Sequence, residues 1–144
     1  MALFKFTKAI LNGDPIDVYN HGEMSRDFTY IDDLTNSIYN IIGISPDQLK
    51  NKLSERDSKS PVAPFRIVNI GNSRPQKLLD FIEAIEAAVG LSAIKIYKEM
   101  QQGDVPSTFA DISLLKQLTD YVPSTSIEEG VKKFVAWYCD YYEY

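Results

Sequence analysis

The sequence predicts an α/β fold in which helices alternate with short strands. Apolar residues recur at helical spacing in five segments, and shorter runs between them have the spacing of strands. The 144 residues allow one domain of ordinary size with a core of its own. The predicted strands are too few for a complete doubly wound sheet, so we expect an α/β fold with a small sheet.

The spacings define nine elements, and their ends carry recognisable residues. In chain order the elements are a helix at 4–11, strands at 16–19 and 26–30, a helix at 31–42, a strand at 65–70, a helix at 75–89, a strand at 94–97, and helices at 112–118 and 125–138. Asn12-Gly13 ends the first helix, because both residues accept the left-handed backbone found at helix ends. At the start of the second helix, Asp32 or Asp33 can accept hydrogen bonds from free backbone amides.

The later elements are predicted in the same way. The strand at 65–70 is apolar on both faces, as expected for a strand that is buried on both sides. The helix after it opens near Pro75 and closes at Gly90. Thr125 and Glu128 have the spacing of a capping box, which predicts the start of the last helix.

Residues 46–64 are the most polar part of the chain. We interpret them as a polar surface insertion, an exposed loop with at most one turn of helix, within a single domain that spans residues 1–144. A structureless insertion of this length is unusual in a compact domain, so it is expected to be functional or mobile.

The composition argues against several classes of partner. The net charge is −5, which disfavours binding to nucleic acid or to an anionic membrane, although a local basic site can still bind an anion. Cys139 and His21 are the only residues of their types, so neither an intramolecular disulfide nor a structural zinc site is expected. The longest apolar runs are far shorter than a membrane span and no signal sequence opens the chain, so we expect a cytoplasmic protein.

The sequence lacks the motifs of a self-contained nicotinamide enzyme. No three of its glycines have the spacing that cradles a dinucleotide pyrophosphate at a helix N-terminus. No tyrosine is followed four residues later by lysine, and no P-loop, HExxH motif or nucleophile elbow is present. We therefore expect no catalytic residue, no metal and no bound cofactor in this chain.

Two segments do carry ligand chemistry. In the first, residues 25–33, the Arg26 guanidinium is suited to bonding phosphate oxygens with two parallel hydrogen bonds. In the second, residues 100–106, Asp104 follows a glycine in a loop and could accept hydrogen bonds from a sugar diol. The alternatives are structural: Arg26 could pair with a nearby carboxylate on the surface, and Gly-Asp loops are common turns.

The stretches SRDFTYIDDL, NIGNSRP and MQQGDVPSTFADIS resemble the carboxy-terminal lobe of the extended short-chain dehydrogenase/reductase family, which includes the nucleotide-sugar epimerases and dehydratases. Within that family, the opening MALFKFTKAI and the run PIDVYNHGEMSRDFTYIDD are most similar to UDP-glucuronate 4-epimerases. The resemblance covers nearly the whole chain apart from residues 46–64.

The resemblance implies an enzyme of two lobes. A Rossmann domain holds NAD and the catalytic tyrosine and lysine, and a smaller lobe grips the UDP-sugar. The 144 residues match the smaller lobe alone and lack the Rossmann NAD domain; Met1 matches an internal methionine, so we expect a truncated or excised chain. The resemblance assigns five substrate-binding residues: Arg26 at the phosphates, Asp104 near the ribose, Tyr19 and Val18 beside the uracil, and Gln101 where relatives acting on UDP-galactose often carry arginine.

The resemblance implies that this chain is the UDP-sugar-binding portion of an NAD-dependent 4-epimerase and is inactive alone. The intact parent is expected to invert the configuration at C4 of UDP-glucuronate through a 4-keto intermediate. The alternatives are a UDP-sugar decarboxylase or dehydratase lobe, and a non-catalytic interaction domain from a truncated gene. In the family, the strand that resembles 65–70 extends the Rossmann sheet. Without that sheet we expect exposed apolar surface and a homo-oligomer, most simply a two-fold dimer.

Overall fold

The computed structural model describes residues 2–46, 55 and 57–144, which fall into two compact units. The first unit comprises Met1–Arg26, Pro75–Thr108 and Ser126–Tyr144, and the second comprises Asp27–Arg74 and Phe109–Thr125. Each unit is therefore assembled from segments that are far apart in the sequence.

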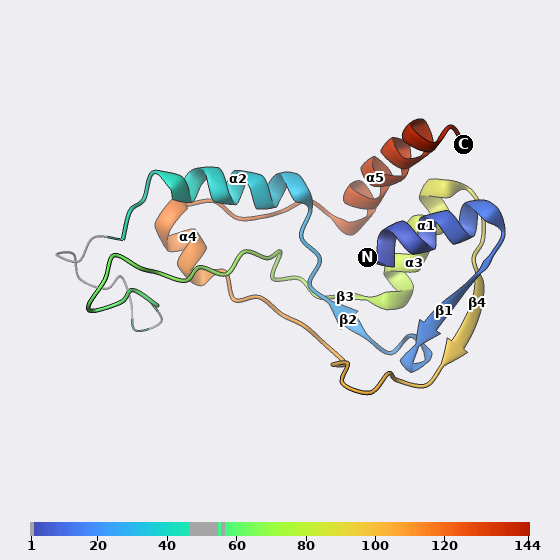
Figure 1. Ribbon diagram of the computed structural model, residues 1–144, viewed down its shortest axis with the longest axis horizontal. Helices are drawn as coiled ribbons and strands as arrows, with labels where there is room; N and C mark the ends of the chain where they lie inside the picture. The colour runs from blue at the N-terminus through green and yellow to red at the C-terminus, as the bar shows by residue number, and fades with distance from the viewer. Residues whose placement is uncertain (1, 47–54, 56) are drawn as a thin grey trace. The chain divides into compact units, whose positions relative to one another are not determined.

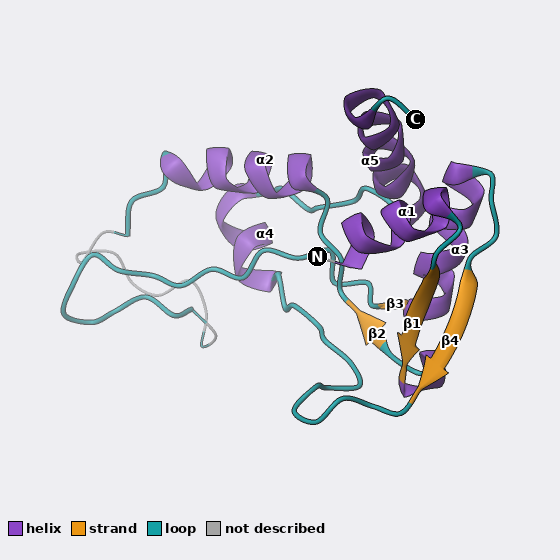
Figure 2. Cartoon of the chain, turned by 45° about the vertical axis from the view of Figure 1, so that its right-hand side comes forward, coloured by secondary structure: helices purple, strands orange, loops and turns teal. Residues whose placement is uncertain are grey.

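The first unit places helices against a two-stranded parallel sheet (Figure 1). Its elements are α1 (Ala2–Asn12), β1 (Pro15–Tyr19), the 3-10 turn η1 (Asn20–Gly22), β2 (Ser25–Arg26), β3 (Gln76–Lys77), α3 (Leu78–Val89), β4 (Ile94–Lys98) and α5 (Ile127–Tyr142). β1 and β4 pair in parallel, with Pro15 opposite Ile94 and Tyr19 opposite Lys98 (Figure 2). β2 and β3 form a separate antiparallel pair of two residues each.

Alternation along β1 decides which of its side chains enter the core of the first unit. Ile16 and Val18 are buried and pack with Ile82 of α3, whereas Asp17 and Tyr19 stay partly exposed. Burying each such apolar side chain contributes about 1.5–3 kcal/mol. α3 also contacts α1 and α5, so this one helix joins the sheet to the other helices of the unit.

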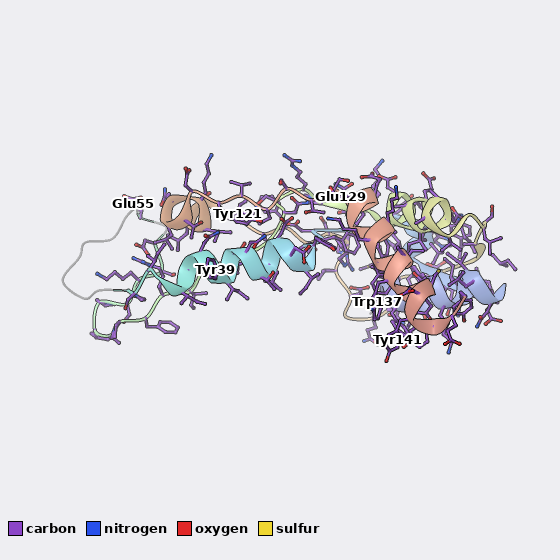
Figure 3. All side chains as sticks on the ribbon, turned by 90° about the horizontal axis from the view of Figure 1, so that it is seen from above. Tyr39, Glu55, Tyr121, Glu129, Trp137 and Tyr141 are labelled. Carbon is purple, nitrogen blue, oxygen red and sulfur yellow. The ribbon has the colours of Figure 1, made fainter. Side chains whose placement is uncertain are left out.

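Aromatic side chains join α1 to α5. The Phe4 ring meets the buried Tyr138 ring edge-on, with the ring centroids 5.0 Å apart. Trp137 and Tyr141 follow one another along the outer face of α5 and stack with their centroids 5.4 Å apart (Figure 3). Tyr138 is therefore the buried member of the aromatic contact between α1 and α5.

Two helix starts in the first unit differ from the predictions. α3 begins at Leu78, three residues after Pro75, because the intervening Gln76 and Lys77 pair with β2. α5 begins at Ile127, and its N-cap is Ser126, whose side chain accepts a hydrogen bond from the backbone N–H of Glu129 at 3.2 Å. The N-cap therefore lies one residue later than predicted. The end of α3 is confirmed, because Gly90 has a left-handed backbone with φ of +79°.

The second unit contains α2 (Ile31–Ile42) and α4 (Ser113–Thr119), which contact one another (Figure 1). Asp33 is buried, and its carboxylate accepts hydrogen bonds from the Tyr121 hydroxyl at 2.8 Å and from the backbone amides of Ser124 and Thr125 at 3.2 and 2.9 Å. The prediction that Asp32 or Asp33 caps its own helix is wrong, since no side chain caps the start of α2. The carboxylate of Asp33 instead fixes the segment that follows α4.

Asp27 has a similar role in the second unit. Its carboxylate accepts hydrogen bonds from the backbone amides of Asn72 at 3.1 Å and of Ser73 and Ala110 at 3.0 Å. This bonding accompanies the early end of the predicted strand at 26–30, of which only Arg26 lies in a strand. Gly71 is required beside it, because a Cβ at that position would collide with the Cβ of Ala110.

The predicted buried strand at 65–70 is not formed. The backbone there lies outside any strand, and Phe65 and Ile67 are exposed. The Ser58 hydroxyl forms two hydrogen bonds with the backbone of Ile67: it accepts from the N–H at 2.9 Å and donates to the carbonyl oxygen. The apolar character of residues 65–70 predicted a strand. No strand forms there, because none of the described residues pairs with this segment as a neighbouring strand.

The predicted exposed insertion at 46–64 is partly outside the described residues, which omit 47–54 and 56. Within the remainder, Asp57 and Lys59 are buried, so the prediction of an exposed loop is wrong at these two residues. The Arg66 guanidinium donates to both carboxylate oxygens of Asp57, at 2.9 and 3.0 Å. This bidentate pair explains why a charged side chain can be buried there.

Candidate functional site

The first unit brings the two predicted ligand segments together. Ser25 and Arg26 of β2 lie beside the loop that follows β4, where Ser25 forms an isolated parallel bridge with Ser107. The Ser25 N–H donates to the Pro106 carbonyl oxygen at 2.9 Å, and the Thr108 N–H donates to the Ser25 carbonyl oxygen at 3.2 Å. The two hydroxyls of the bridge are 2.7 Å apart. These backbone contacts fix the loop against the strand.

Arg26 and Asp104 form an ion pair in this site. Nη2 of Arg26 donates to Oδ1 of Asp104 at 2.7 Å, and the exposed fractions of the two side chains are 26% and 36%. Nη1 of Arg26 donates to the carbonyl oxygens of Ser25 at 2.8 Å and Pro106 at 3.4 Å. The alternative in which Arg26 pairs with a carboxylate close to it in sequence is therefore not what the structure shows.

The other predicted site residues differ in what they can offer a ligand. Val18 is 0% exposed and lies in the core, so neither its side chain nor its backbone is open to a ligand. Tyr19 is half-buried at the end of β1, with its hydroxyl 3.5 Å from Oδ2 of Asp17. Gln101 is exposed, and its carbonyl oxygen accepts from the Asp104 N–H at 3.2 Å.

Two side-chain contacts near the carboxyl ends of β1 and β4 were not predicted. Lys98 donates to Oδ2 of Asp17 at 2.7 Å, and its Nζ lies 5.9 Å from the centroid of the Tyr19 ring. The hydrogen bond with Asp17 raises the pKa of Lys98. His21 pairs with Glu99 at 3.1 Å. The parallel register sets Lys98 opposite Tyr19, two residues from Asp17, and the spacing of residues in the sequence does not report that register.

Within residues 2–46, 55 and 57–144, no group of three or more His, Cys, Asp or Glu residues could hold a metal ion. Over that same part of the chain, no helix has the length and apolar character needed to cross a membrane.

Known proteins with similar sequences cover almost all of this chain. No protein-family model matches it. A probable UDP-glucuronate 4-epimerase of Rhizobium meliloti is 53% identical over 140 residues, which are 96% of this chain and 41% of that protein. UDP-glucuronate 4-epimerase 1 of Arabidopsis thaliana is 39% identical and matches 100% of this chain with 34% of its own length. The chain is homologous to the carboxy-terminal part of UDP-glucuronate 4-epimerases.

Solved epimerase structures show the same fold. The UDP-glucuronic acid 4-epimerase of Bacillus cereus, in complex with UDP-glucuronic acid and NAD, matches 96% of this chain with a TM-score of 0.73 and 25% identity. The UDP-glucose 4-epimerase of Thermotoga maritima, at 21% identity, matches 99% with a TM-score of 0.77 and supports the fold alone. Each match uses 40% of the solved chain, so this chain spans about two fifths of the epimerases it resembles.

Proposed function

We propose that this chain is the UDP-sugar-binding portion of an NAD-dependent nucleotide-sugar 4-epimerase that acts on UDP-glucuronate. The observation that carries the proposal is the hydrogen-bonded ion pair between Arg26 and Asp104, two residues that are 78 positions apart in sequence. The homology to UDP-glucuronate 4-epimerases supports the choice of nucleotide and sugar.

The chain's own residues are suited to holding the nucleotide. Arg26 supplies a guanidinium for the phosphates, and the neighbouring loop, with Asp104 and Gln101, borders the same place. Tyr19 offers a partly exposed ring for the uracil. A nucleotide that is fixed at its diphosphate leaves the sugar free to turn between two faces without release.

The proposed reaction needs a hydride acceptor, and the residues of this chain do not form a binding site for one. NAD bound by the intact parent would supply the hydride transfer at C4 of the sugar. The sequence has neither the glycine-rich loop that holds the NAD pyrophosphate nor a tyrosine followed four residues later by lysine. We therefore propose that this chain contributes nucleotide binding and that residues outside it supply the redox chemistry.

Calorimetric titration of the chain with UDP tests the proposal. Charge-assisted hydrogen bonds to phosphate contribute about 1.5–3 kcal/mol, so Arg26→Ala is expected to weaken UDP binding by roughly tenfold to a hundredfold. Lys8→Ala removes the same charge from an exposed position on α1 and is expected to leave the affinity unchanged. Unchanged UDP affinity in Arg26→Ala would remove Arg26 from the site.

Titration with NAD and an assay with UDP-glucuronate complete the test. We expect no NAD binding at micromolar affinity and no epimerisation by the chain alone. Stoichiometric NAD binding, or turnover with NAD and UDP-glucuronate, would contradict the proposed division of roles.

A further inference from the structure

The hydrogen bonds of the Arg26 guanidinium involve only two of its three nitrogen atoms. The guanidinium is held by three acceptors, which are the carbonyl oxygens of Ser25 and Pro106 on Nη1 and the carboxylate of Asp104 on Nη2. Within the part of the chain that the structure describes, no acceptor bonds Nε of Arg26. The Nε edge of the fork is therefore the side on which a phosphate oxygen can be bonded without displacing these contacts.

Asp104 is fixed independently of Arg26. Its Oδ1 also accepts from the Val105 N–H at 2.9 Å, and its own N–H donates to the Gln101 carbonyl oxygen. Gly103 before it has φ of +85°, a backbone conformation that glycine adopts without strain. The loop thus presents one carboxylate oxygen toward the guanidinium, and the position of that oxygen is set by backbone hydrogen bonds.

The pair also changes the charge that an anion meets. Arg26 and Asp104 together carry no net charge, whereas a lone guanidinium carries a full positive charge. Asp104 therefore opposes the binding of a diphosphate even while it orients the group that binds it.

We propose that Asp104 is a positioning residue for Arg26, which holds the guanidinium in place and, as its counter-ion, lowers its affinity for the diphosphate. This inference rests on the proposed function, because it assumes that Arg26 binds phosphate. It differs from a direct contact between Asp104 and the ribose, in which loss of the carboxylate would weaken nucleotide binding and leave the diphosphate alone unaffected.

Inorganic pyrophosphate is the probe that separates these roles, because it has no ribose. Asp104→Asn keeps an acceptor oxygen for Arg26 and removes the negative charge. We expect it to bind pyrophosphate roughly two- to fivefold more tightly than the wild type, the range of a partly exposed ion pair. The gain should shrink as ionic strength rises, because salt screens the removed charge.

Two further variants control the measurement. Asp140→Asn removes the same charge from an exposed position on α5 and is expected to leave pyrophosphate affinity unchanged. Asp104→Ala removes the acceptor as well as the charge, so its affinity should fall below that of Asp104→Asn because the guanidinium loses its anchor. Circular dichroism of each variant verifies that the fold is retained.

The remaining outcomes distinguish the two claims. Pyrophosphate affinity that is equal in the wild type and Asp104→Asn, together with weaker UDP binding in the variant, would overturn the positioning role and place Asp104 at the ribose. Pyrophosphate binding that survives in Arg26→Ala, or that is missing from the wild type, would overturn the phosphate site itself and the inference with it.

Discussion

Single carboxylates fix distant backbone segments in the second unit. Asp33 and Asp27 each accept several hydrogen bonds from segments about 45 to 92 residues away in the sequence. Sequence spacing placed acidic residues at the start of α2 but predicted the wrong partners, because a local pattern carries no information on which amides the fold brings near. The same limit applies to Arg26 and Asp104, which were each predicted to bind ligand but not to meet.

The hydrogen bonds of Asp33 predict a loss of stability on its removal. Asp33→Ala leaves the Tyr121 hydroxyl and two amides without their acceptor, so we expect the free energy of unfolding to fall by roughly 1–3 kcal/mol. Asp32→Ala, at the exposed neighbouring position, should change it little. Chemical denaturation of the two variants makes the comparison, and equal stability would contradict the assigned role.

The pH dependence of that contribution has a definite sign. Burial alone would raise the pKa of Asp33, but hydrogen bonds from Thr125, Tyr121 and Ser124 outweigh it and hold the pKa below its usual value of 3.8. The stabilisation is therefore fully present above that value and is lost as the pH falls through the lower folded-state pKa. The stability difference between the wild type and Asp33→Asn should shrink in that acidic window.

At the scale of elements, the helices were predicted well and the strands less so. Apolar periodicity identified α1, α3 and α5, because each of these helices buries apolar side chains on one face. It also identified α2, although the buried residues of that helix are Asp33 and Ser37 and its Ile42 is exposed. The strands at 26–30 and 65–70 failed because strand formation also needs a neighbouring strand, which the side-chain pattern of one segment does not report. In their place, side chains such as Asp27 and Ser58 satisfy the backbone.

A close approach between two loops gives a prediction at this scale. Gly71→Ala would drive a Cβ into Ala110 and bring it 3.2 Å from Oδ2 of Asp27. We expect a loss of roughly 1–3 kcal/mol, as for other overpacked sites. Gly43→Ala is the matched control, since its Cβ meets no atom within 4 Å and its φ of −78° suits alanine. Thermal unfolding that ranks the two variants equally would contradict this reading.

At the scale of the whole molecule, the second unit exposes apolar side chains. On α2, Tyr39 and Ile42 are 77% and 76% exposed, and Phe65 and Ile67 lie uncovered in the same unit. Surfaces of this kind associate with other chains. We therefore propose a homo-oligomer in which a second copy of the chain covers the exposed apolar side chains of α2, Phe65 and Ile67.

Light scattering at rising concentration tests self-association. We expect the wild type to form a dimer or larger species and Ile42→Glu to shift it toward the monomer. Asn40→Glu adds the same charge at an exposed position of α2 and should have a smaller effect. A wild type that stays monomeric at high concentration would show that this surface tolerates exposure.

The order of the segments along the chain has a consequence for synthesis on the ribosome. The second unit has all of its residues once position 125 has been made, whereas the first unit still waits for Ser126–Tyr144. Since α5 packs on α3, the first unit must hold that apolar helix face without its cover until the last segment emerges. Within these 144 residues the first unit opens before the second unit and closes after it, and a nascent chain stalled before α5 would present the face of α3 to chaperones.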